Sequence, residues 1–201
     1  MPKFDAAATE IYLIRHGQTA WSLQGRHTGR TDVPLTVRGE EQAVALGKRL
    51  AGISFSEVIA SPLGRALRTC ELAGLASGAR IDPDVAERDY GAYEGRTLAE
   101  IRIEAPGWDA MRDDCPQGES YEEFCARADR VVAALRGREG RVAIFSHGHL
   151  LRALAMRWVH LEIREGSHFR LDPASVSVLG FDRGTAAAPV IALWNEAPVR
   201  T

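Results

Sequence analysis

The sequence predicts an α/β fold in which helices cover a largely parallel sheet. Short apolar runs rich in β-branched residues alternate with stretches whose apolar residues have helical spacing, which is typical of parallel βαβ units. Two of the apolar runs end directly in a histidine–glycine pair. The length of 201 residues is that of one ordinary domain, so we expect a single domain over residues 1–201.

The composition is that of an ordinary globular protein. The formal net charge is −2, whereas nucleic-acid-binding domains usually carry a strongly basic face, so we expect no nucleic-acid partner. No run approaches the ~20 apolar residues of a membrane span, and no apolar signal-peptide core follows the amino terminus. The three cysteines form no C-x-x-C pair and are expected to be free thiols. We therefore expect a cytoplasmic protein without a membrane partner, either a monomer or a homodimer.

The first half of the chain contains three predicted strands and two predicted helices. The helices begin at Thr36 and Ser61, because serine and threonine hydroxyls are typical N-caps. Pro62 follows Ser61 at the first helical position, where its missing N–H costs nothing. The predicted bounds are 10–15, 57–60 and 80–82 for the strands, and 36–50 and 61–76 for the helices.

The second half begins with a polar loop over residues 84–95. Two helices follow, each opened by a capping box, Thr97-x-x-Glu100 and Ser120-x-x-Glu123. Between them, residues 106–118 are irregular and form a candidate lid, since lids are loops. The remaining predicted elements are strands at 141–145, 169–171, 175–181 and 190–194, and a helix at 150–159.

The two histidine–glycine pairs indicate a functional site. His16 ends the first strand, and His147 ends the strand at 141–145. Ligands of parallel sheets bind at the carboxyl ends of the strands, so both histidines are expected at that edge. A neutral imidazole can attack phosphorus, and cationic groups stabilise the phosphoryl group during its transfer. Arg15 and Arg65 are candidate cations, and Glu87 on the polar loop could protonate the leaving oxygen.

Four motifs resemble, in order, the signature of the histidine phosphatase superfamily, also called phosphoglycerate-mutase-like. They are RHGQT at 15–19, SPLGRALRT at 61–69, ERDYGAYEG at 87–95 and SHG at 146–148. The resemblance extends from about Ile11 to Trp194. It implies a three-layer α/β/α sandwich around a largely parallel, mixed sheet, and a phosphatase acting on phosphomonoesters of small metabolites.

The resemblance also implies a role for each catalytic residue. His16 is the nucleophile that forms a phosphohistidine, with its other ring nitrogen held by a backbone carbonyl. Arg15, Arg65 and His147 bind the phosphoryl oxygens. Glu87 protonates the leaving oxygen and then deprotonates the attacking water. No metal and no cofactor is implied.

Within the superfamily, the motifs are most similar to the fungal sedoheptulose-1,7-bisphosphatase branch, whose substrate is a sugar bisphosphate. The chain has a shorter stretch after Arg152 than that branch. The likeness implies a small phosphorylated metabolite, such as a sugar phosphate or bisphosphate, whose second phosphate or hydroxyls Arg152 would reach. The implied substrate-binding residues are Gln18, Ser22, His27, Thr28, Tyr90 and Arg152.

Several alternatives stay open at this point. The chain could be a cofactor-dependent phosphoglycerate mutase, although mutases of this family generally carry extra segments around the site. It could also be a non-catalytic module that binds phosphorylated ligands. Glu94 is a second candidate acid, but its position in the motif favours Glu87. His149 is expected to pack or to form hydrogen bonds at a helix start, because a metal site needs three or four converging ligands.

The electrostatics predict the pH dependence. Two arginines beside His16 disfavour its protonated form, and a bound phosphate dianion makes Glu87 easier to protonate. We therefore expect protonation of the histidine to limit activity at low pH and deprotonation of the glutamate to limit it at high pH.

Overall fold

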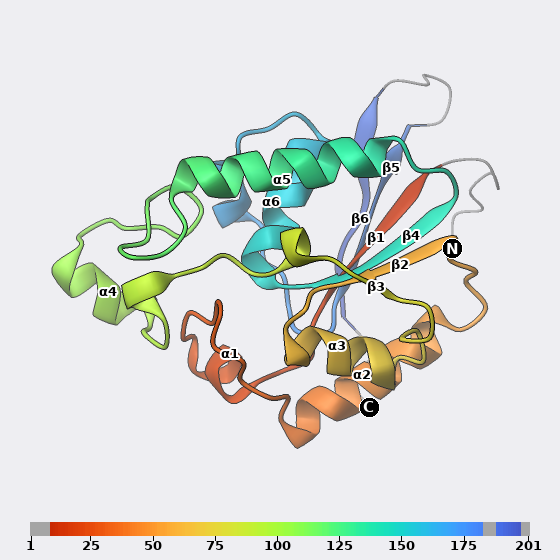
Figure 1. The fold of residues 1–201 in the computed structure, drawn as a ribbon, viewed down its shortest axis with the longest axis horizontal. Helices are drawn as coiled ribbons and strands as arrows, with labels where there is room; N and C mark the ends of the chain where they lie inside the picture. Colours follow the sequence, from red (N-terminus) through yellow and green to blue (C-terminus); the bar gives the residue numbers. More distant parts are fainter. Residues whose placement is uncertain (1–8, 183–187, 198–201) are drawn as a thin grey trace.

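A mixed six-stranded sheet forms the middle of the molecule (Figure 1). The structure is a computed structural model, and it describes residues 9–182 and 188–197. In the strand order β3-β2-β4-β1-β5-β6, the first four strands are parallel, whereas β5 runs antiparallel to both β1 and β6. The strands are β1 Glu10–Arg15, β2 Glu57–Ala60, β3 Arg80–Ile81, β4 Arg141–Ser146, β5 Val176–Phe181 and β6 Pro189–Glu196. The predicted largely parallel, mixed sheet is confirmed.

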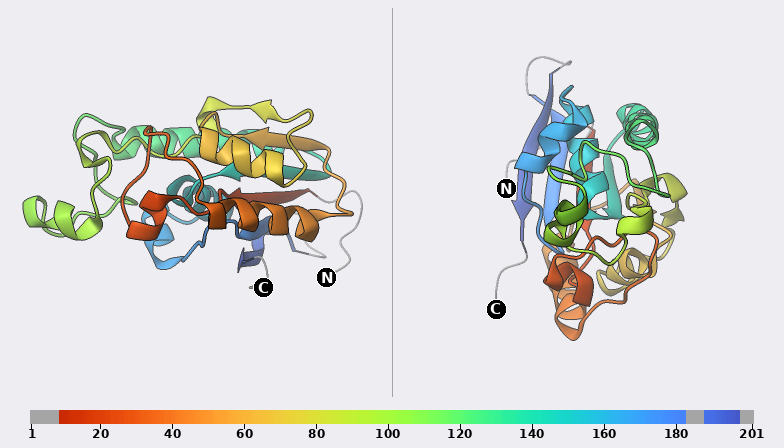
Figure 2. Two further views of the ribbon diagram at one scale, coloured as in Figure 1. Left: turned by 90° about the horizontal axis from the view of Figure 1, so that it is seen from below. Right: turned by 90° about the vertical axis from the view of Figure 1, so that its left-hand side faces the viewer.

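Helices cover both faces of this sheet, which makes three layers (Figure 2). Helices α5 and α6 pack on one face, and α2 and α3 on the other. The α-helices are α1 Ala20–Gln24, α2 Val37–Leu50, α3 Gly64–Leu72, α4 Leu98–Glu104, α5 Tyr121–Arg136 and α6 Gly148–Trp158, and short 3₁₀ helices span Pro83–Val85, Gly91–Tyr93 and Ile163–His168. No helix within the described ranges is long and apolar enough to cross a bilayer.

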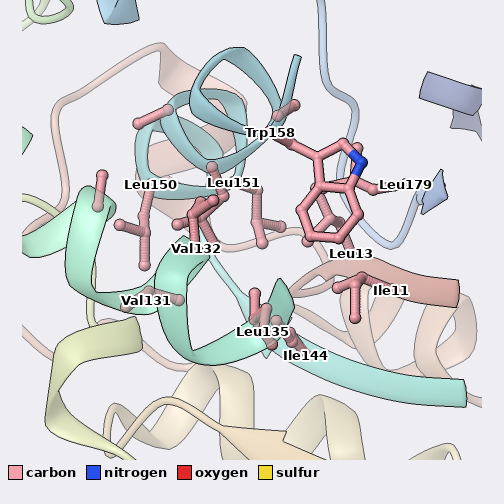
Figure 3. Close-up of a cluster of buried hydrophobic side chains, with 14 of the residues drawn as sticks. Ile11, Leu13, Val131, Val132, Leu135, Ile144, Leu150, Leu151, Trp158 and Leu179 are labelled. Carbon is pink, nitrogen blue, oxygen red and sulfur yellow. The ribbon is translucent and has the colours of Figure 1, made fainter. Parts of the chain in front are cut away.

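The alternation of side chains along β1 divides the core into two parts. Ile11 and Leu13 point to the α5/α6 face, where they pack with residues such as Trp158 (Figure 3). Tyr12 and Ile14 point to the α2/α3 face. Burying one such aliphatic side chain is worth about 1.5–3 kcal/mol, so both layers hold β1, and therefore its carboxyl end, in place.

The predicted caps are confirmed at three helices. Thr36 caps α2 by accepting from the Gly39 N–H, and the capping boxes that begin at Thr97 and Ser120 open α4 and α5. The short helix α1 was not predicted. Its N-cap Thr19 forms a capping box with Ser22, a residue that the usual glutamate or glutamine pattern does not include.

The predicted start and end of the helix after β2 are wrong. Helix α3 begins at Gly64, and its N-cap is Leu63, which has no side-chain cap; the Ser61 hydroxyl accepts from the Leu63 N–H at 3.3 Å and lies 2.7 Å from His147 Nε2. The helix ends at Leu72 rather than Ala76. Gly74 takes the left-handed conformation (φ 77°), and its N–H and that of the following residue bond back to the last turn, as in a Schellman motif.

The predicted strand at 169–171 is also wrong. Two of its backbone carbonyls accept hydrogen bonds from side chains and not from a neighbouring strand. The Arg170 carbonyl accepts from the Trp194 indole at 2.7 Å, and the Leu171 carbonyl accepts from the Arg15 guanidinium. The strands expected at 175–181 and 190–194 are present as β5 and β6.

The irregular segment 106–118 is packed against the loop at 90–93. Its buried residues Trp108, Ala110 and Cys115 share a cluster with Tyr90 and Tyr93. The segment contains no helix or strand, as predicted. Its action as a lid stays a prediction. Cys70, Cys115 and Cys125 are free thiols, which confirms that expectation.

Candidate active site

The register of the two central strands brings the two histidines together. Arg15 on β1 pairs with Ser146 on β4, and the His16 N–H donates to the Ser146 carbonyl at 3.0 Å. The ring centroids of His16 and His147 are consequently 5.1 Å apart. Both side chains are buried. The expectation that the strand ends meet at one edge of the sheet is confirmed.

A cavity of about 280 Å³ opens beside His16. Pockets for drug-sized ligands are about 300–1,000 Å³, so this cavity suits a small metabolite. Five of the six predicted substrate-binding residues line it. The sixth, Gln18, does not, and its amide oxygen instead accepts from the Thr36 hydroxyl at 3.0 Å. The lining residues are Arg15, His16, Ser22, His27, Thr28, Glu87, Tyr90, Gly148, His149, Arg152, Arg170 and Leu171.

The His16 ring is held as a neutral base with one free nitrogen. Its Nδ1 lies 2.7 Å from the Gly17 carbonyl oxygen. A carbonyl can only accept, so Nδ1 carries the hydrogen and Nε2 keeps its lone pair. Burial, and then the charges of Arg15 and Arg65, lower the pKa of His16 to about 3. At neutral pH the ring is therefore uncharged and its Nε2 can act as a nucleophile.

Glycine is needed directly after His16. A Cβ on Gly17 would lie 2.3 Å from the carbonyl oxygen of Gly39 in the first turn of α2. No side chain fits at that distance, so a larger residue would push the backbone at position 17 away from α2. The carbonyl that holds His16 Nδ1 would move with it.

Two buried guanidinium groups flank the site. Arg65 donates to the carbonyls of Thr28, Gly29 and Thr31 at 3.0, 2.8 and 2.9 Å, while its Nε is buried without a partner. The Arg15 Nε is likewise buried and unpartnered among the described residues. Arg15 lines the cavity, whereas Arg65 lies outside its lining. Buried charged donors without partners are costly unless an anion completes them, so the Arg15 side of the cavity is suited to a phosphoryl group.

The Arg15 anchor depends on the last strand. Arg15 donates to the Leu171 carbonyl, and the next residue, Asp172, is held on both sides by Asn195 of β6. The Asp172 N–H donates to Asn195 Oδ1 at 2.7 Å, and Asn195 Nδ2 donates to Asp172 Oδ2 at 3.0 Å. Asn195 adopts φ 56°, a left-handed conformation that asparagine tolerates better than most residues.

The ring of His147 lies beside the Ser61 hydroxyl. The Ser61 oxygen accepts from the Leu63 N–H at 3.3 Å and lies 2.7 Å from His147 Nε2, to which the Ser61 hydroxyl can donate. Nδ1 must then carry the ring hydrogen, and it is buried without a partner among the described residues. Burial, and then Arg65, hold the pKa of His147 well below its usual value. His147 is thus a neutral donor beside His16.

Glu87 is held as a carboxylate by the N-terminus of α6. Its Oε1 accepts from the Arg88 and Leu150 N–H groups and its Oε2 from the His149 N–H, each at 3.0 Å. Burial raises the pKa of Glu87, but the hydrogen bonds that its carboxylate accepts, among them the one from the His149 N–H, outweigh it and hold that pKa well below the usual range. In the free protein, the carboxyl is therefore already ionised at neutral pH.

Glu94, the alternative acid, has a different task. Its carboxylate accepts the N–H groups of Arg30, Thr31 and Tyr90 at 3.0, 3.3 and 3.4 Å. Glu94 thus connects the loop at 28–31, whose carbonyls accept from Arg65, to the loop at 84–95, which contains Glu87. These contacts favour Glu87 as the acid.

Sequence reasoning missed three residues around the cavity. The sequence predicts a helix cap at Ser61 and a strand at Arg170. For His149 it predicts packing or hydrogen bonds at a helix start, which is confirmed, because His149 lies in the first turn of α6 and its Nδ1 is 2.6 Å from the Tyr90 hydroxyl. His149 and Arg170 line the cavity, and Ser61 orients His147. The H-G-H spacing after β4 was the one available signal, because it places His149 one residue beyond Gly148. No three histidine, cysteine, aspartate or glutamate side chains within the described ranges are grouped so that they could hold a metal ion.

The neutral histidines predict a loss of stability in acid. The pKa of His16 is about 3 and that of His149 about 4 in the folded protein, whereas both titrate near 6.5 when unfolded. Below pH 6.5 the unfolded chain binds protons that the folded chain does not, so the free energy of unfolding falls. We expect each ring to contribute about 1 kcal/mol of this loss between pH 6 and pH 5.

Urea unfolding at a series of pH values measures this loss. The His149→Asn variant is expected to show a shallower decline than the parent protein. A free energy of unfolding that stays constant between pH 6.5 and pH 5 would contradict the neutral state of these rings.

The family model described as the histidine phosphatase superfamily (branch 1) matches residues 11–197. The acid phosphatase of Mycobacterium tuberculosis is 43% identical over 190 residues, which cover 92% of this chain and 93% of that protein. A protein named "Probable phosphoglycerate mutase GpmB" from Salmonella choleraesuis is 34% identical over 185 residues, covering 86% of this chain and 85% of the relative.

Solved structures share the same fold. That of the open reading frame Rv3214 from Mycobacterium tuberculosis has a TM-score of 0.88 at 41% identity and covers 94% of this chain and 98% of that chain. The alpha-ribazole phosphatase from Shigella flexneri has a TM-score of 0.79 at 27% identity and covers 96% of this chain and 100% of that chain.

Proposed function

The chain belongs to the histidine phosphatase superfamily and is a phosphoric monoester hydrolase, and from this premise we propose that it acts through a phosphohistidine on His16, with Glu87 as the proton donor. The substrate we propose is a small phosphorylated metabolite, in the first place a sugar phosphate or bisphosphate. The observation that carries the mechanism is the His16 ring, whose Nδ1 is engaged by the Gly17 carbonyl and whose Nε2 is free.

In the first step, the His16 Nε2 lone pair attacks phosphorus and the bond from phosphorus to the ester oxygen breaks. Glu87 delivers a proton to that oxygen, so the alcohol leaves neutral. Arg15, Arg65 and the His147 Nδ1–H bind the phosphoryl oxygens, whose charge they are placed to stabilise during the transfer.

In the second step, a water molecule attacks the phosphohistidine. Glu87, now a carboxylate, takes a proton from this water, the phosphorus–nitrogen bond breaks, and inorganic phosphate leaves. His16 returns to its neutral state. The proton on Glu87, which entered with the substrate monoanion, leaves with the product as dihydrogen phosphate, so Glu87 is again a carboxylate. The cycle thus needs no proton beyond those of the substrate and water.

The cavity supports a substrate with a second polar or anionic group. Arg152 lies in the lining and is held by the carbonyls of Gly148 and Gly166 at 3.1 and 3.3 Å, and Arg170 lines the same cavity. Together with Arg15, the lining carries three guanidinium groups and one carboxylate, Glu87. A phosphoryl dianion balances the net positive charge of these four lining side chains. The buried guanidinium of Arg65 adds one more positive charge nearby, which favours a substrate with a second acidic group.

Truncation of Arg152 tests the substrate class. We expect Arg152→Ala to lower kcat/KM for sugar bisphosphates by about 10- to 100-fold, because a charge-assisted hydrogen bond worth about 1.5–3 kcal/mol is lost. A monophosphate without a second anion should change by less than about threefold. The measurement is kcat/KM over a panel that contains sedoheptulose and fructose bisphosphates, phosphoglycerates and an aryl phosphate. Equal losses on all substrates would contradict the assignment.

The ionised state of Glu87 predicts an acid pH optimum. Because the free carboxyl has a lowered pKa, the proton must enter with the substrate, whose monoester titrates near pH 6. We expect kcat/KM for an alkyl phosphate to be flat from about pH 4 to pH 6 and then to fall about tenfold per pH unit. Because the pKa of His16 is about 3, the loss of activity caused by protonation of His16 is expected only below about pH 4. A kcat/KM that rises between pH 5 and pH 7 would contradict this arrangement.

One assay separates the proposed hydrolase from the mutase alternative. The protein is mixed with 3-phosphoglycerate and a trace of 2,3-bisphosphoglycerate. Release of inorganic phosphate faster than isomerisation supports the hydrolase. Faster isomerisation would assign the chain to the activity named for its Salmonella relative. Binding without either reaction would leave the non-catalytic module.

A further inference from the structure

We propose that Tyr90 and His149 form a positioning pair that keeps one oxygen of Glu87, Oε2, free to carry the proton used in the reaction. This inference rests on the proposed function, because it concerns the proton that Glu87 delivers. It adds two residues that act through Glu87, and it names the oxygen on which Glu87 works.

The hydrogen bonds to Glu87 distinguish its two oxygens. A carboxylate oxygen can accept about two hydrogen bonds. Oε1 already accepts two, from the N–H groups of Arg88 and Leu150, and Oε2 accepts one, from the His149 N–H. Among the described residues, a lone pair is therefore left on Oε2, and a proton carried by Glu87 belongs there.

The His149 ring is the group that could block this lone pair. Its Nδ1 lies 3.7 Å from Glu87 Oε2, so a small rotation would allow an N–H at this position to bond the carboxylate. Such a bond would hold Glu87 in its charged form and occupy the place of the transferable proton. The backbone of the same residue donates to Oε2 in any case. The tautomer of the ring therefore decides whether Oε2 stays available.

Tyr90 sets this tautomer. Its hydroxyl lies 2.6 Å from His149 Nδ1 and has no other partner among the described residues. Tyr90 is buried, and a buried hydroxyl hydrogen without an acceptor is costly, so the hydroxyl donates to Nδ1. Nδ1 then carries no hydrogen of its own and cannot donate to Glu87. Burial, which lowers the pKa of His149 to about 4, keeps the ring in this neutral form.

Removing the Tyr90 hydroxyl is the smallest change that releases Nδ1. It leaves the ring packed against His27, whose centroid is 4.9 Å away, and it alters no charge. The other groups around Glu87 stay in place. They are Arg15 and His16 at the end of β1, His27 after α1, Arg65 on α3, His147 at the end of β4, and Arg152 on α6.

The test compares Tyr90→Phe, His149→Ala and their double variant on two substrates. An alkyl phosphate needs a proton on its leaving oxygen, whereas p-nitrophenyl phosphate scarcely does. The matched control is Tyr93→Phe, which removes the hydroxyl of a buried tyrosine in the same loop that does not line the cavity. Nitrogen NMR of the labelled protein reports independently whether His149 Nδ1 carries a hydrogen.

For Tyr90→Phe we expect kcat on the alkyl phosphate to fall about 10- to 100-fold, within the range of general acid catalysis, and kcat on p-nitrophenyl phosphate to fall less than about threefold. The falling limb of the kcat profile, which Glu87 sets in the enzyme–substrate complex, moves to lower pH, and NMR shows a hydrogen on Nδ1 that the parent protein lacks. In the double variant, loss of the ring restores at least about fivefold of the lost kcat on the alkyl phosphate.

Other outcomes overturn the inference. Equal losses on both substrates with a raised KM and no restoration in the double variant mean that Tyr90 contacts the substrate directly. A hydrogen on Nδ1 in the parent protein also refutes the pair. If the parent protein hydrolyses neither substrate, the proposed function fails, whereas the NMR comparison still decides the tautomer.

Discussion

Replacing His16 with alanine is expected to lower kcat by about 10⁴- to 10⁶-fold, the loss typical of a removed nucleophile. The variant loses Nε2, the uncharged base beside the two buried arginines, and a water molecule there has no comparable nucleophilicity. The parent protein is expected to accumulate an acid-labile phosphate during rapid-quench turnover, and the variant is expected to lack it. Mass spectrometry of the quenched protein measures both the label and its position.

His168→Ala is the matched control, since His168 is exposed at the end of a 3₁₀ helix away from the cavity lining. It should keep full activity and the phosphate label. Retention of more than about a hundredth of the activity in His16→Ala would contradict nucleophilic catalysis by this residue.

The second large effect is expected from Arg65→Met, which should lower the free energy of unfolding by about 3–5 kcal/mol and kcat/KM by about 10³-fold. Three loop carbonyls would lose their donor inside the protein, and each unsatisfied carbonyl costs about 1–3 kcal/mol. The loop they belong to carries Thr28 of the cavity lining, so the same change loosens one wall of the cavity. It also removes a cation that we propose to bind the phosphoryl group.

Urea unfolding and steady-state kinetics measure the two losses separately. Arg68→Met on the same helix is the control, because Arg68 is exposed and its ion pairs with Glu40 and Glu71 are worth about 1 kcal/mol or less. If Arg65→Met unfolds like this control, the three carbonyl contacts do not stabilise the loop.

Local signals predicted those parts of the fold whose contacts are local. Thr36, Thr97 and Ser120 cap their helices through residues three positions further along. Ser61 carried the same signal, but His147 lies 86 residues away in sequence and engages its hydroxyl. The strand expected at 169–171 failed for the same kind of reason, since Arg15 reaches it across 156 residues. The local sequence pattern around Ser61 or Leu171 contains no information about partners so distant in the chain.

The candidate site divides along the same line. Strand ends in a parallel sheet share an edge, so His16 and His147 could be placed together from the pattern alone. The spacing of motifs indicated Glu87, but not that α6 holds it as a carboxylate. The H-G-H spacing indicated His149, whereas Arg170 gave no distinctive signal, because its place in the cavity depends on segments that only the folded sheet brings near.

The clamp between Asp172 and Asn195 links the edge of the sheet to its centre. Asn195 lies on the outermost strand β6, yet it fixes the segment whose carbonyl orients the guanidinium of Arg15 on the central strand β1. Local opening of β6 would therefore release the Leu171 carbonyl and, with it, the orientation of Arg15. Fluctuations at an exposed margin of the molecule should thus be felt at the arginine that we propose to bind phosphate.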